Sequence, residues 1–259
     1  MANESRGLVL RIERSSIYDG PGLRVVLFLK GCPLSCKWCS TPESQNRFIE
    51  KGFGEILTVD QAVEEICKDE IFFFHSGGGV TVSGGECLLQ VDFVASVLEK
   101  CRRRGIHTAI ETSLFAPWQS VEKILPFLNT IYVDLKHPDA LIHEKFTGVD
   151  NSLILNNLEK LGNSKHLFDF HLRIPLIPGI NDSDENLLAS LSIAASIRKL
   201  KEIEVLPYHR LGVGTYEKLG RSYELENIDT PSKEYIIERT SFLRKQGLNV
   251  DLKVGGGYF

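Results

Sequence analysis

Short apolar runs alternate with longer amphipathic segments along most of the chain, and this pattern constrains the fold more than any other feature. Several of the runs are rich in Val, Ile and Leu, as strands buried on both faces tend to be. The six clearest candidates are residues 23–30, 80–83, 107–112, 131–136, 171–175 and 202–207, with a weaker seventh at 249–254. Such alternation predicts parallel strands joined by crossover helices, which is the α/β class.

The segments between these runs carry helix signals. One segment places apolar residues at spacings of three and four, namely Val91, Val94, Leu98 and Cys101. Gly105 follows it where a left-handed helix end is expected. Thr58 and Gln61 form a capping-box pattern that opens another helix at about residue 59. Thr230 and Pro231 have the form of an N-cap and first helical residue for the last long helix.

The bulk composition is that of an ordinary globular protein. The 259 residues are 42% hydrophobic and 25% charged, with no internal repeat and no Gly/Ser linker, so we expect a single domain over residues 1–259. The formal net charge of -4 provides no basic excess for a phosphate backbone, which predicts no nucleic-acid partner. No apolar run approaches the roughly 20 residues of a membrane span. We expect a cytoplasmic monomer that does not associate with membranes.

Three of the six cysteines lie close together. Cys32, Cys36 and Cys39 fall within eight positions, directly after an apolar strand and Gly31. This clustering favours metal ligation in a reducing compartment over a disulfide framework. Three thiolates can hold an iron–sulfur cube and leave its fourth iron open to substrate. The spacing therefore predicts a catalytic cluster at this loop.

A structural zinc site is the main alternative for these thiols. It would need a fourth ligand, for which His75 or His107 could be offered. Structural zinc sites generally use paired C-x2-C knuckles, and only Cys36 and Cys39 have that spacing. The other three cysteines, Cys67, Cys87 and Cys101, have no ligand spacing and are interpreted as small buried side chains.

The cysteine loop carries a family resemblance. Its C-x3-C-x-aromatic-C pattern, with Trp38 at the aromatic position, resembles the signature of the radical S-adenosylmethionine (SAM) superfamily. Gly84, Gly85 and Glu86, after the next strand, resemble the glycine-rich methionine-binding motif of that superfamily. Over essentially the whole chain the sequence resembles the activating enzymes of glycyl radical enzymes. That wider match is carried by residues 19–24 (Asp-Gly-Pro-Gly-Leu-Arg), 77–86 and 134–136.

The resemblance implies a partial (β/α)6 TIM-like barrel and a defined radical chemistry. One [4Fe–4S] cluster would bind SAM through its open iron and break the sulfonium C–S bond with one electron. The radical so formed would take hydrogen from a glycine Cα of a partner glycyl radical enzyme. A flavodoxin or a ferredoxin would donate the electron.

Polar residues follow most of the predicted strands, at the ends where α/β barrels build their active sites. Gly84 and Gly85 would let the backbone approach the methionyl group closely. Asp134 and Lys136 should share one strand face, with Lys136 meeting the methionyl carboxylate. Glu111 stands where the family has an Asp before Thr112, and its longer side chain argues against the monovalent-cation site of pyruvate formate-lyase activating enzyme. The resemblance implies instead that Glu111 contacts the amino group or the ribose of the cofactor.

The resemblance implies further contacts at both ends of the chain. Arg173 and His209 match positions that contact the cofactor from the far strands. Asp19, Gly20, Pro21 and Gly22 match a loop that lies against the glycine loop of the partner. Glu86 and Trp38 complete the set of residues expected beside the cofactor.

The sequence also allows an alternative substrate and a hypothesis about the partner enzyme. A radical SAM enzyme acting on a small metabolite, such as a deazapurine-forming synthase, is the main alternative. Residues 40–45 (Ser-Thr-Pro-Glu-Ser-Gln) look more like activating enzymes for diol dehydratases, choline lyases and arylacetate decarboxylases than like those for pyruvate formate-lyase. Those enzymes usually carry a ferredoxin-like insertion after this stretch, and residues 45–58 contain no cysteine for one.

Overall fold

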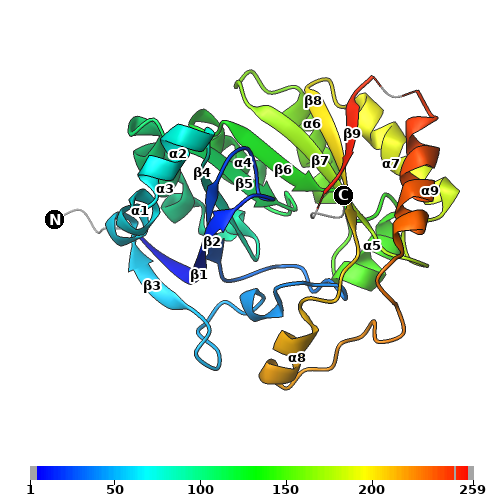
Figure 1. Cartoon of the computed structure of the whole chain (residues 1–259), viewed down its shortest axis with the longest axis horizontal. Helices are drawn as coiled ribbons and strands as arrows, with labels where there is room; N and C mark the ends of the chain where they lie inside the picture. The colour runs from blue at the N-terminus through cyan, green and yellow to red at the C-terminus, as the bar shows by residue number, and fades with distance from the viewer. Residues whose placement is uncertain (1–4, 248, 256–259) are drawn as a thin grey trace. The chain divides into compact units, whose positions relative to one another are not determined.

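The structure, a computed structural model, describes residues 5–247 and 249–255. Its strands form one mostly parallel sheet in the order β3-β1-β2-β4-β5-β6-β7-β8-β9. The strands are β1 (Arg6–Ser16), β2 (Arg24–Leu29), β3 (Glu55–Thr58), β4 (Gly79–Gly84), β5 (His107–Thr112), β6 (Thr130–Asp134), β7 (Asp169–Leu176), β8 (Leu200–Pro207) and β9 (Asp251–Val254). Figure 1 follows them by colour along the chain.

Helices fill most of the connections between the strands. They are α1 (Val59–Cys67), α2 (Glu70–Ser76), α3 (Val91–Arg103), α4 (Trp118–Ile124), α5 (Ala140–Thr147), α6 (Ser152–Gly162), α7 (Asp184–Ser196), α8 (Val213–Leu219) and α9 (Lys233–Arg244). Three short 3-10 turns complete the set: Pro42–Ser44, Cys87–Gln90 and Leu125–Phe127. In the part of the chain that the structure describes, no helix is both long and apolar enough to cross a membrane.

The chain divides into two compact units. The N-terminal unit comprises Met1–Pro33, Glu43–Ile131 and His166–Phe168, and the C-terminal unit comprises Leu34–Pro42, Tyr132–Lys165 and Asp169–Phe259. Cys32 therefore belongs to the first unit, whereas Cys36 and Cys39 belong to the second. Each unit is described by itself below.

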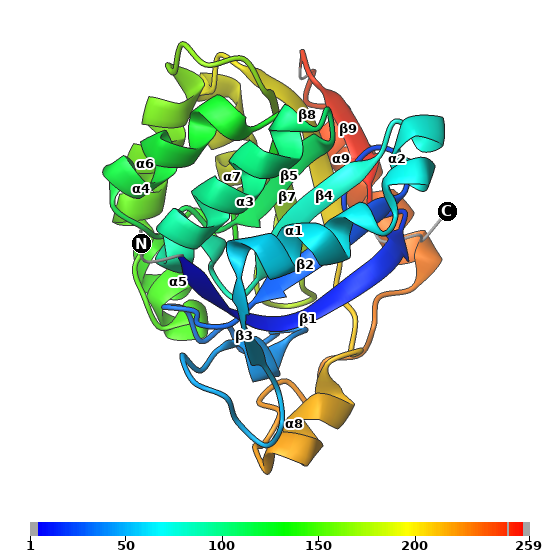
Figure 2. The same cartoon turned by 90° about the vertical axis from the view of Figure 1, so that its left-hand side faces the viewer.

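The N-terminal unit is built on strands β3-β1-β2-β4-β5. The β2–β4 and β4–β5 pairs are parallel, with Leu29 opposite Gly84 and Val82 opposite Ile110, while β1 pairs antiparallel with both β2 and β3. Helices α1 and α3 pack against each other and lie over these strands, as Figure 2 shows. The parallel register brings the ends of β2 and β4 to the same edge of the sheet.

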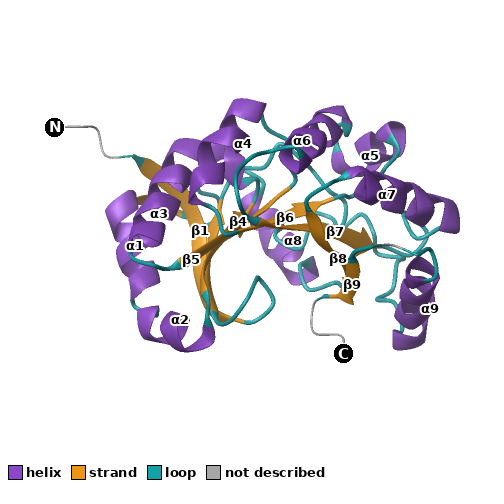
Figure 3. Ribbon diagram, turned by 90° about the horizontal axis from the view of Figure 1, so that it is seen from above, coloured by secondary structure: helices purple, strands orange, loops and turns teal. Residues whose placement is uncertain are grey.

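The C-terminal unit contains the parallel strands β7, β8 and β9. Arg173 stands opposite Glu204, and Glu204 stands opposite Lys253. Helices α7 and α9 pack together, and Figure 3 shows both of them beside these strands. The residue after β6, Leu135, donates its backbone N–H to Arg173 O at 2.8 Å.

Most of the predicted strands and caps are confirmed. Residues 107–112 form β5 with the predicted bounds, and β2, β4, β7 and β8 differ from prediction by at most two residues at either end. The capping box is present, because Gln61 N–H donates to Thr58 Oγ1 at 3.2 Å and Thr58 N–H donates to Gln61 Oε1 at 2.9 Å. Gly105 has the left-handed φ of 74° expected after α3.

Two further strands differ from their predicted bounds by up to two residues, one predicted cap is wrong, and two strands were not predicted. The strand expected over 131–136 is shifted to Thr130–Asp134, so Lys136 lies beyond it, and the strand expected from residue 249 starts at Asp251. Thr230 does not cap the last long helix, because Ser232 accepts from Tyr235 N–H and the helix begins at Lys233. Strands β1 and β3 were not predicted, since β3 is a short strand at the edge of the sheet and the second half of β1 is charged and largely exposed.

Candidate functional site

Cys32 lies just beyond β2 and is fixed by backbone hydrogen bonds within the N-terminal unit. Cys32 N–H donates to Gln45 O at 3.0 Å, and the preceding Gly31 N–H donates to Ser44 O at 2.6 Å. On its other side, Gly31 O accepts from Glu86 N–H at 2.8 Å. Ser44 and Gln45, which follow the third cysteine, and Glu86, two residues after β4, therefore hold the Cys32 end of the loop.

Gly84 and Gly85 are required by close backbone packing at the end of β4. Gly84 has a φ of 111°, and a Cβ there would lie 2.3 Å from the backbone N of Leu29. A Cβ on Gly85 would lie 2.2 Å from Gly31 O. A side chain at either position would push β4 away from β2 and from the residue before Cys32. The two glycines thus have a packing role independent of any cofactor contact.

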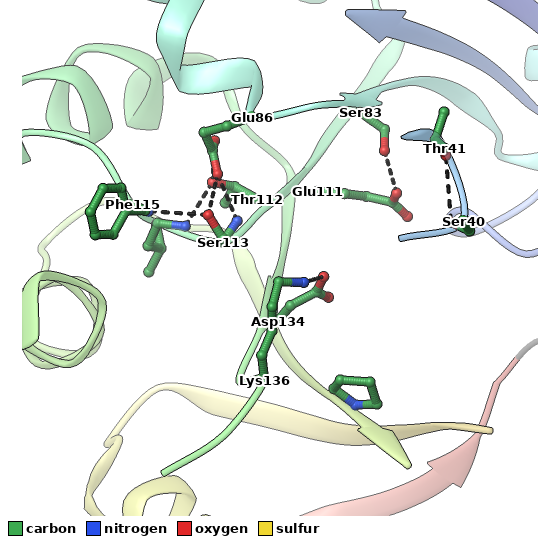
Figure 4. Close-up of polar contacts among 12 residues, drawn as sticks. Ser40, Thr41, Ser83, Glu86, Glu111, Thr112, Ser113, Phe115, Asp134 and Lys136 are labelled. Carbon is green, nitrogen blue, oxygen red and sulfur yellow. Dashed lines mark hydrogen bonds and ion pairs between the residues drawn. The ribbon is translucent and has the colours of Figure 1, made fainter. Parts of the chain in front are cut away.

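The Glu86 side chain joins the loops that follow β4 and β5 (Figure 4). Glu86 is 1% exposed, and its Oε1 accepts from Thr112 Oγ1 at 2.6 Å and from Leu88 N–H at 3.1 Å. Oε2 accepts from the Ser113 hydroxyl at 2.6 Å and from Ser113 N–H at 2.8 Å. Both oxygens of Glu86 therefore have partners inside the N-terminal unit.

We expect Glu86→Gln to lower the free energy of unfolding by about 1.5–3 kcal/mol, the scale of hydrogen bonds to a charged group. In the glutamine variant an NH2 group replaces one carboxylate oxygen and faces groups that themselves donate hydrogen bonds. Buried donors are then left without an acceptor. Urea unfolding monitored by circular dichroism measures the change. Glu99→Gln on the outside of α3, where the side chain is 39% exposed, should change stability by less than about 0.5 kcal/mol. Equal losses in the two variants would contradict the network.

Glu111 has a separate partner at the end of the neighbouring strand. Ser83 Oγ donates to Glu111 Oε2 at 2.6 Å, as Figure 4 shows. Thr112, the other member of the predicted pair, donates to Glu86 and accepts from Leu114 N–H at 2.9 Å. The pair is therefore divided, with Thr112 in the Glu86 network and Glu111 beside Ser83.

In the C-terminal unit the rest of the cysteine loop binds the end of α5. Ser35 N–H donates to Thr147 O at 2.7 Å and Lys37 N–H donates to Phe146 O at 3.0 Å. Carbonyls in the last turn of a helix have no partner within the helix, so the loop satisfies them. The Trp38 ring lies 6.2 Å from the Phe146 ring, centroid to centroid. The helix end thus sets the path of the chain on both sides of Cys36.

Cys36 is buried near an ion pair formed by the residues at the end of β6. Lys136 Nζ lies 2.8 Å from Asp134 Oδ2, and the Lys136 side chain is 13% exposed (Figure 4). Burial raises the pKa of the Cys36 thiol, an effect that Lys136 opposes and Asp134 reinforces. The two residues that the sequence predicted to face one way do meet, although Lys136 lies beyond the strand.

Arg173 contacts side chains on the strands beside it. Its Nε donates to Glu204 Oε2 at 2.6 Å, and its guanidinium carbon lies 4.2 Å from the centroid of the Tyr132 ring. Glu204 was missed by the sequence analysis, although Glu202 and Glu204 are acidic residues at alternate positions of β8. His209 follows the end of β8, and burial lowers its pKa.

The loop of Asp19, Gly20, Pro21 and Gly22 lies at the other edge of the sheet of the N-terminal unit, before β2. Thr81 Oγ1 donates to Asp19 O at 2.6 Å, and the buried Arg24 donates from Nε to Thr81 Oγ1 at 2.9 Å. A Cβ on Gly22, which has a φ of 67°, would lie 2.4 Å from Gly78 N. The loop is thus fastened at the starts of β2 and β4, whereas Cys32 and Gly84 lie at the ends of these strands.

The chemistry of the thiol set fits an iron–sulfur cube. None of the six cysteines forms a disulfide. Within residues 5–247 and 249–255, no three His, Cys, Asp or Glu side chains are grouped so as to hold one metal ion. A zinc site needs its ligands around a single point, whereas a cube presents a separate iron to each thiolate. The C-x3-C-x2-C spacing of the three thiols is compatible with the second requirement.

Comparison with known proteins defines the class. The family model described as the radical SAM superfamily matches residues 26–191 of the chain, a span that includes all three loop cysteines, Asp134 and Arg173. The chain thus belongs to the radical SAM superfamily.

The chain is also similar to specific enzymes of that superfamily. It is 35% identical to a (2S)-3-sulfopropanediol dehydratase activating enzyme from Klebsiella oxytoca, over 88% of this chain and 90% of the relative. It is 34% identical to a trans-4-hydroxy-L-proline dehydratase activating enzyme from Clostridioides difficile, over 96% and 99%. A crystal structure of a domain of pyruvate-formate lyase-activating enzyme from Bacteroides vulgatus ATCC 8482 superposes with a TM-score of 0.57 at 32% identity, covering 69% of this chain and 99% of that one.

The chain therefore belongs to the activating enzymes of glycyl radical enzymes. Its cofactors are a [4Fe–4S] cluster and SAM, and its protein substrate is a glycyl radical enzyme. The predicted α/β class and partial (β/α)6 TIM-like barrel are confirmed, and a small-metabolite substrate is not favoured.

Proposed function

We propose that Cys32, Cys36 and Cys39 ligate the cluster and that the polar groups at the strand ends orient SAM on it. The thiol loop carries this assignment, because backbone hydrogen bonds hold Cys32 in the N-terminal unit and the neighbours of Cys36 in the C-terminal unit. When bound, the cluster supplies the electron that cleaves SAM and so yields the radical that takes hydrogen from the glycine Cα of the partner. The chain itself provides orientation and excludes water.

The strand-end residues divide this work. The Lys136 ammonium binds the methionyl carboxylate, and Asp134 holds the ammonium at 2.8 Å. Arg173 and His209 contact the cofactor from the far strands, with Glu204 orienting Arg173. Gly84 and Gly85 offer backbone groups to the methionyl moiety. We assign Glu86 a positioning role, since both of its oxygens already have donors.

We expect Lys136→Ala to weaken SAM binding by about 1.5–3 kcal/mol, because a charge-assisted hydrogen bond to the carboxylate is lost. Equilibrium binding of SAM to the cluster-loaded protein measures this, and the cluster spectrum should not change. The matched control is Lys123→Ala, which removes an exposed lysine that pairs with Asp92. Unchanged SAM affinity in Lys136→Ala would contradict the proposed contact between Lys136 and the methionyl carboxylate.

We also propose that the Asp19–Gly22 loop recognises the partner. Asp19→Ala should leave SAM cleavage without partner intact and should lower installation of the glycyl radical, because a misplaced hydrogen donor loses its near-attack geometry. The two readouts are 5′-deoxyadenosine release and the electron paramagnetic resonance (EPR) signal of the glycyl radical. A proportional fall in both would show that the loop supports the cluster instead.

The partner proposed for this chain is a dehydratase, lyase or decarboxylase of the glycyl radical type. Relatives of similar identity are named choline trimethylamine-lyase activating enzyme and 4-hydroxyphenylacetate decarboxylase activating enzyme. Residues 40–45 support the same partners, because this stretch resembles the activating enzymes of diol dehydratases, choline lyases and arylacetate decarboxylases. Mixing the reduced, SAM-bound protein with candidate partners and recording the glycyl radical doublet tests this, and a doublet formed only with pyruvate formate-lyase would refute it.

We propose further that the chain works as a monomer and accepts its electron from a flavodoxin or a ferredoxin. An activating enzyme must expose its site to a large folded substrate, which a monomer does without rearrangement. Size-exclusion chromatography with light scattering tests the oligomeric state. Cluster reduction by purified flavodoxin or ferredoxin, followed by EPR, tests the donor.

A further inference from the structure

Residues 208–228, called here the cover segment, follow β8 and contain α8. They touch the cysteine loop in the C-terminal unit at three separate points. A Cβ on Gly212 would lie 2.8 Å from Ser40 O and 2.9 Å from Cys39 O, so the two backbones are in close contact. Arg221 Nη1 donates to Pro42 O at 3.1 Å, and Glu224 Oε2 lies 2.7 Å from Lys37 Nζ.

The centre of the contact is aromatic. Tyr208, Tyr216 and Tyr223 are each at most 7% exposed and form a buried cluster against which Trp38 and Cys39 pack. The hydroxyls of Tyr208 and Tyr223 are 2.6 Å apart, and the rings of Tyr216 and Tyr223 meet edge to face at 5.1 Å.

This packing has a consequence for any cluster that Cys36 and Cys39 hold. Exposure to solvent is one of the factors that set the potential of an iron–sulfur centre, and the apolar shell around a metal site controls that exposure. Reduction adds a negative charge, which water stabilises. Keeping water away therefore lowers the reduction potential, and a strongly reducing cluster is what cleavage of SAM requires.

We propose that the cover segment shields the Cys36–Cys39 side of the bound cluster from water, with Tyr216 as the positioning residue at its centre. The segment thereby keeps the cluster strongly reducing and slows the loss of its iron. The inference rests on the proposed ligand role of Cys36 and Cys39, and it goes further by assigning a function to a region more than 160 residues away in the sequence.

Two glycines provide a matched test. Gly212→Ala places a methyl group against the Cys39 and Ser40 carbonyls, whereas Gly214→Ala meets no atom within 4 Å. Neither glycine has a positive φ, so the backbone tolerates alanine at both. In cluster-loaded protein, Gly212→Ala should shift the reduction potential to a less negative value in an EPR-monitored titration. It should also speed iron removal by a chelator about tenfold, the scale seen when supporting groups around a metal are lost.

A second pair of variants tests Tyr216 itself. Tyr216→Ala should raise the potential and speed iron loss, and Tyr216→Phe, which keeps the ring, should not. Ile236→Ala on α9 removes a side chain that is 1% exposed and serves as the control for general destabilisation. The proposal is overturned if Gly212→Ala and Gly214→Ala behave alike, or if Ile236→Ala shifts the potential as much as Tyr216→Ala. Failure of the ligand assignment would look different, because cluster loading would then survive the loss of Cys36.

Discussion

Cys36→Ala should release no 5′-deoxyadenosine from SAM when the protein is reduced with dithionite. Two remaining thiolates cannot hold a cube with its open iron in place, so the loss should be complete and not partial. Cys36 is the most buried thiol of the loop, and Ser35 and Lys37 on either side of it donate to the end of α5. The alanine variant should therefore fold with the loop path retained and still lack activity.

Cys101→Ala is the matched control for this experiment. Cys101 is also a buried thiol, but it belongs to the buried face of α3 in the N-terminal unit and is not part of the cysteine loop at residues 32–39. Its removal should cost some stability and leave SAM cleavage per bound cluster unchanged. If Cys36→Ala cleaved SAM at the parent rate, the ligand assignment would be wrong.

The parts of the site that could be predicted from the sequence are those set by local spacing. The three cysteines and Trp38 occupy a loop of eight residues, and Asp134 and Lys136 are two positions apart. Distances along so short a chain are limited by backbone geometry, so the pattern alone brings these groups near one another. Strand β5 was likewise predictable, because its residues follow directly on Gly105 and Ile106, where the preceding helix has ended.

Contacts between distant segments could not be predicted in the same way. Glu86 was interpreted as a cofactor ligand from its place in the glycine motif, yet its partners Thr112 and Ser113 follow the next strand. Pairing of Arg173 with Glu204 depends on the register of β7 and β8, which a one-residue slip would abolish. The sequence states neither the register nor the loop path.

The same limit applies to the cover segment. Gly212 and Tyr216 have ordinary helix-end and helix contexts, and nothing in their local sequence indicates the cysteine loop as the neighbour. The cover segment meets the cysteine loop because the chain turns back after β8, and this turn is part of the tertiary structure. Long-range packing of this kind is where a structure adds most to a motif that the sequence already reveals.

The second expected result concerns the number of clusters that each chain binds, which should be one. We expect anaerobically reconstituted protein to hold about four iron and four sulfide, since one [4Fe–4S] centre accounts for all the ligand spacing in the sequence. Residues 45–58 contain no cysteine, whereas an inserted ferredoxin-like segment would need several. The alignment with the Klebsiella oxytoca relative runs over 288 positions, more than the 259 residues of this chain, so that relative carries segments which this chain lacks.

The remaining thiols are poorly placed to add a second cluster. Cys87 and Cys101 are 0% exposed, and burial raises the pKa of both, that of Cys101 to about 12, which opposes formation of the thiolate that iron needs. Cys67 accepts a hydrogen bond from Arg104 Nη1 at 3.4 Å on the surface of α1. A Cys32/Cys36/Cys39 triple alanine variant should therefore lose all bound iron, whereas a Cys67/Cys87/Cys101 triple variant that still folds should keep it. Iron near eight per chain, or a cluster spectrum that persists in the first variant, would show that the scattered cysteines bind metal.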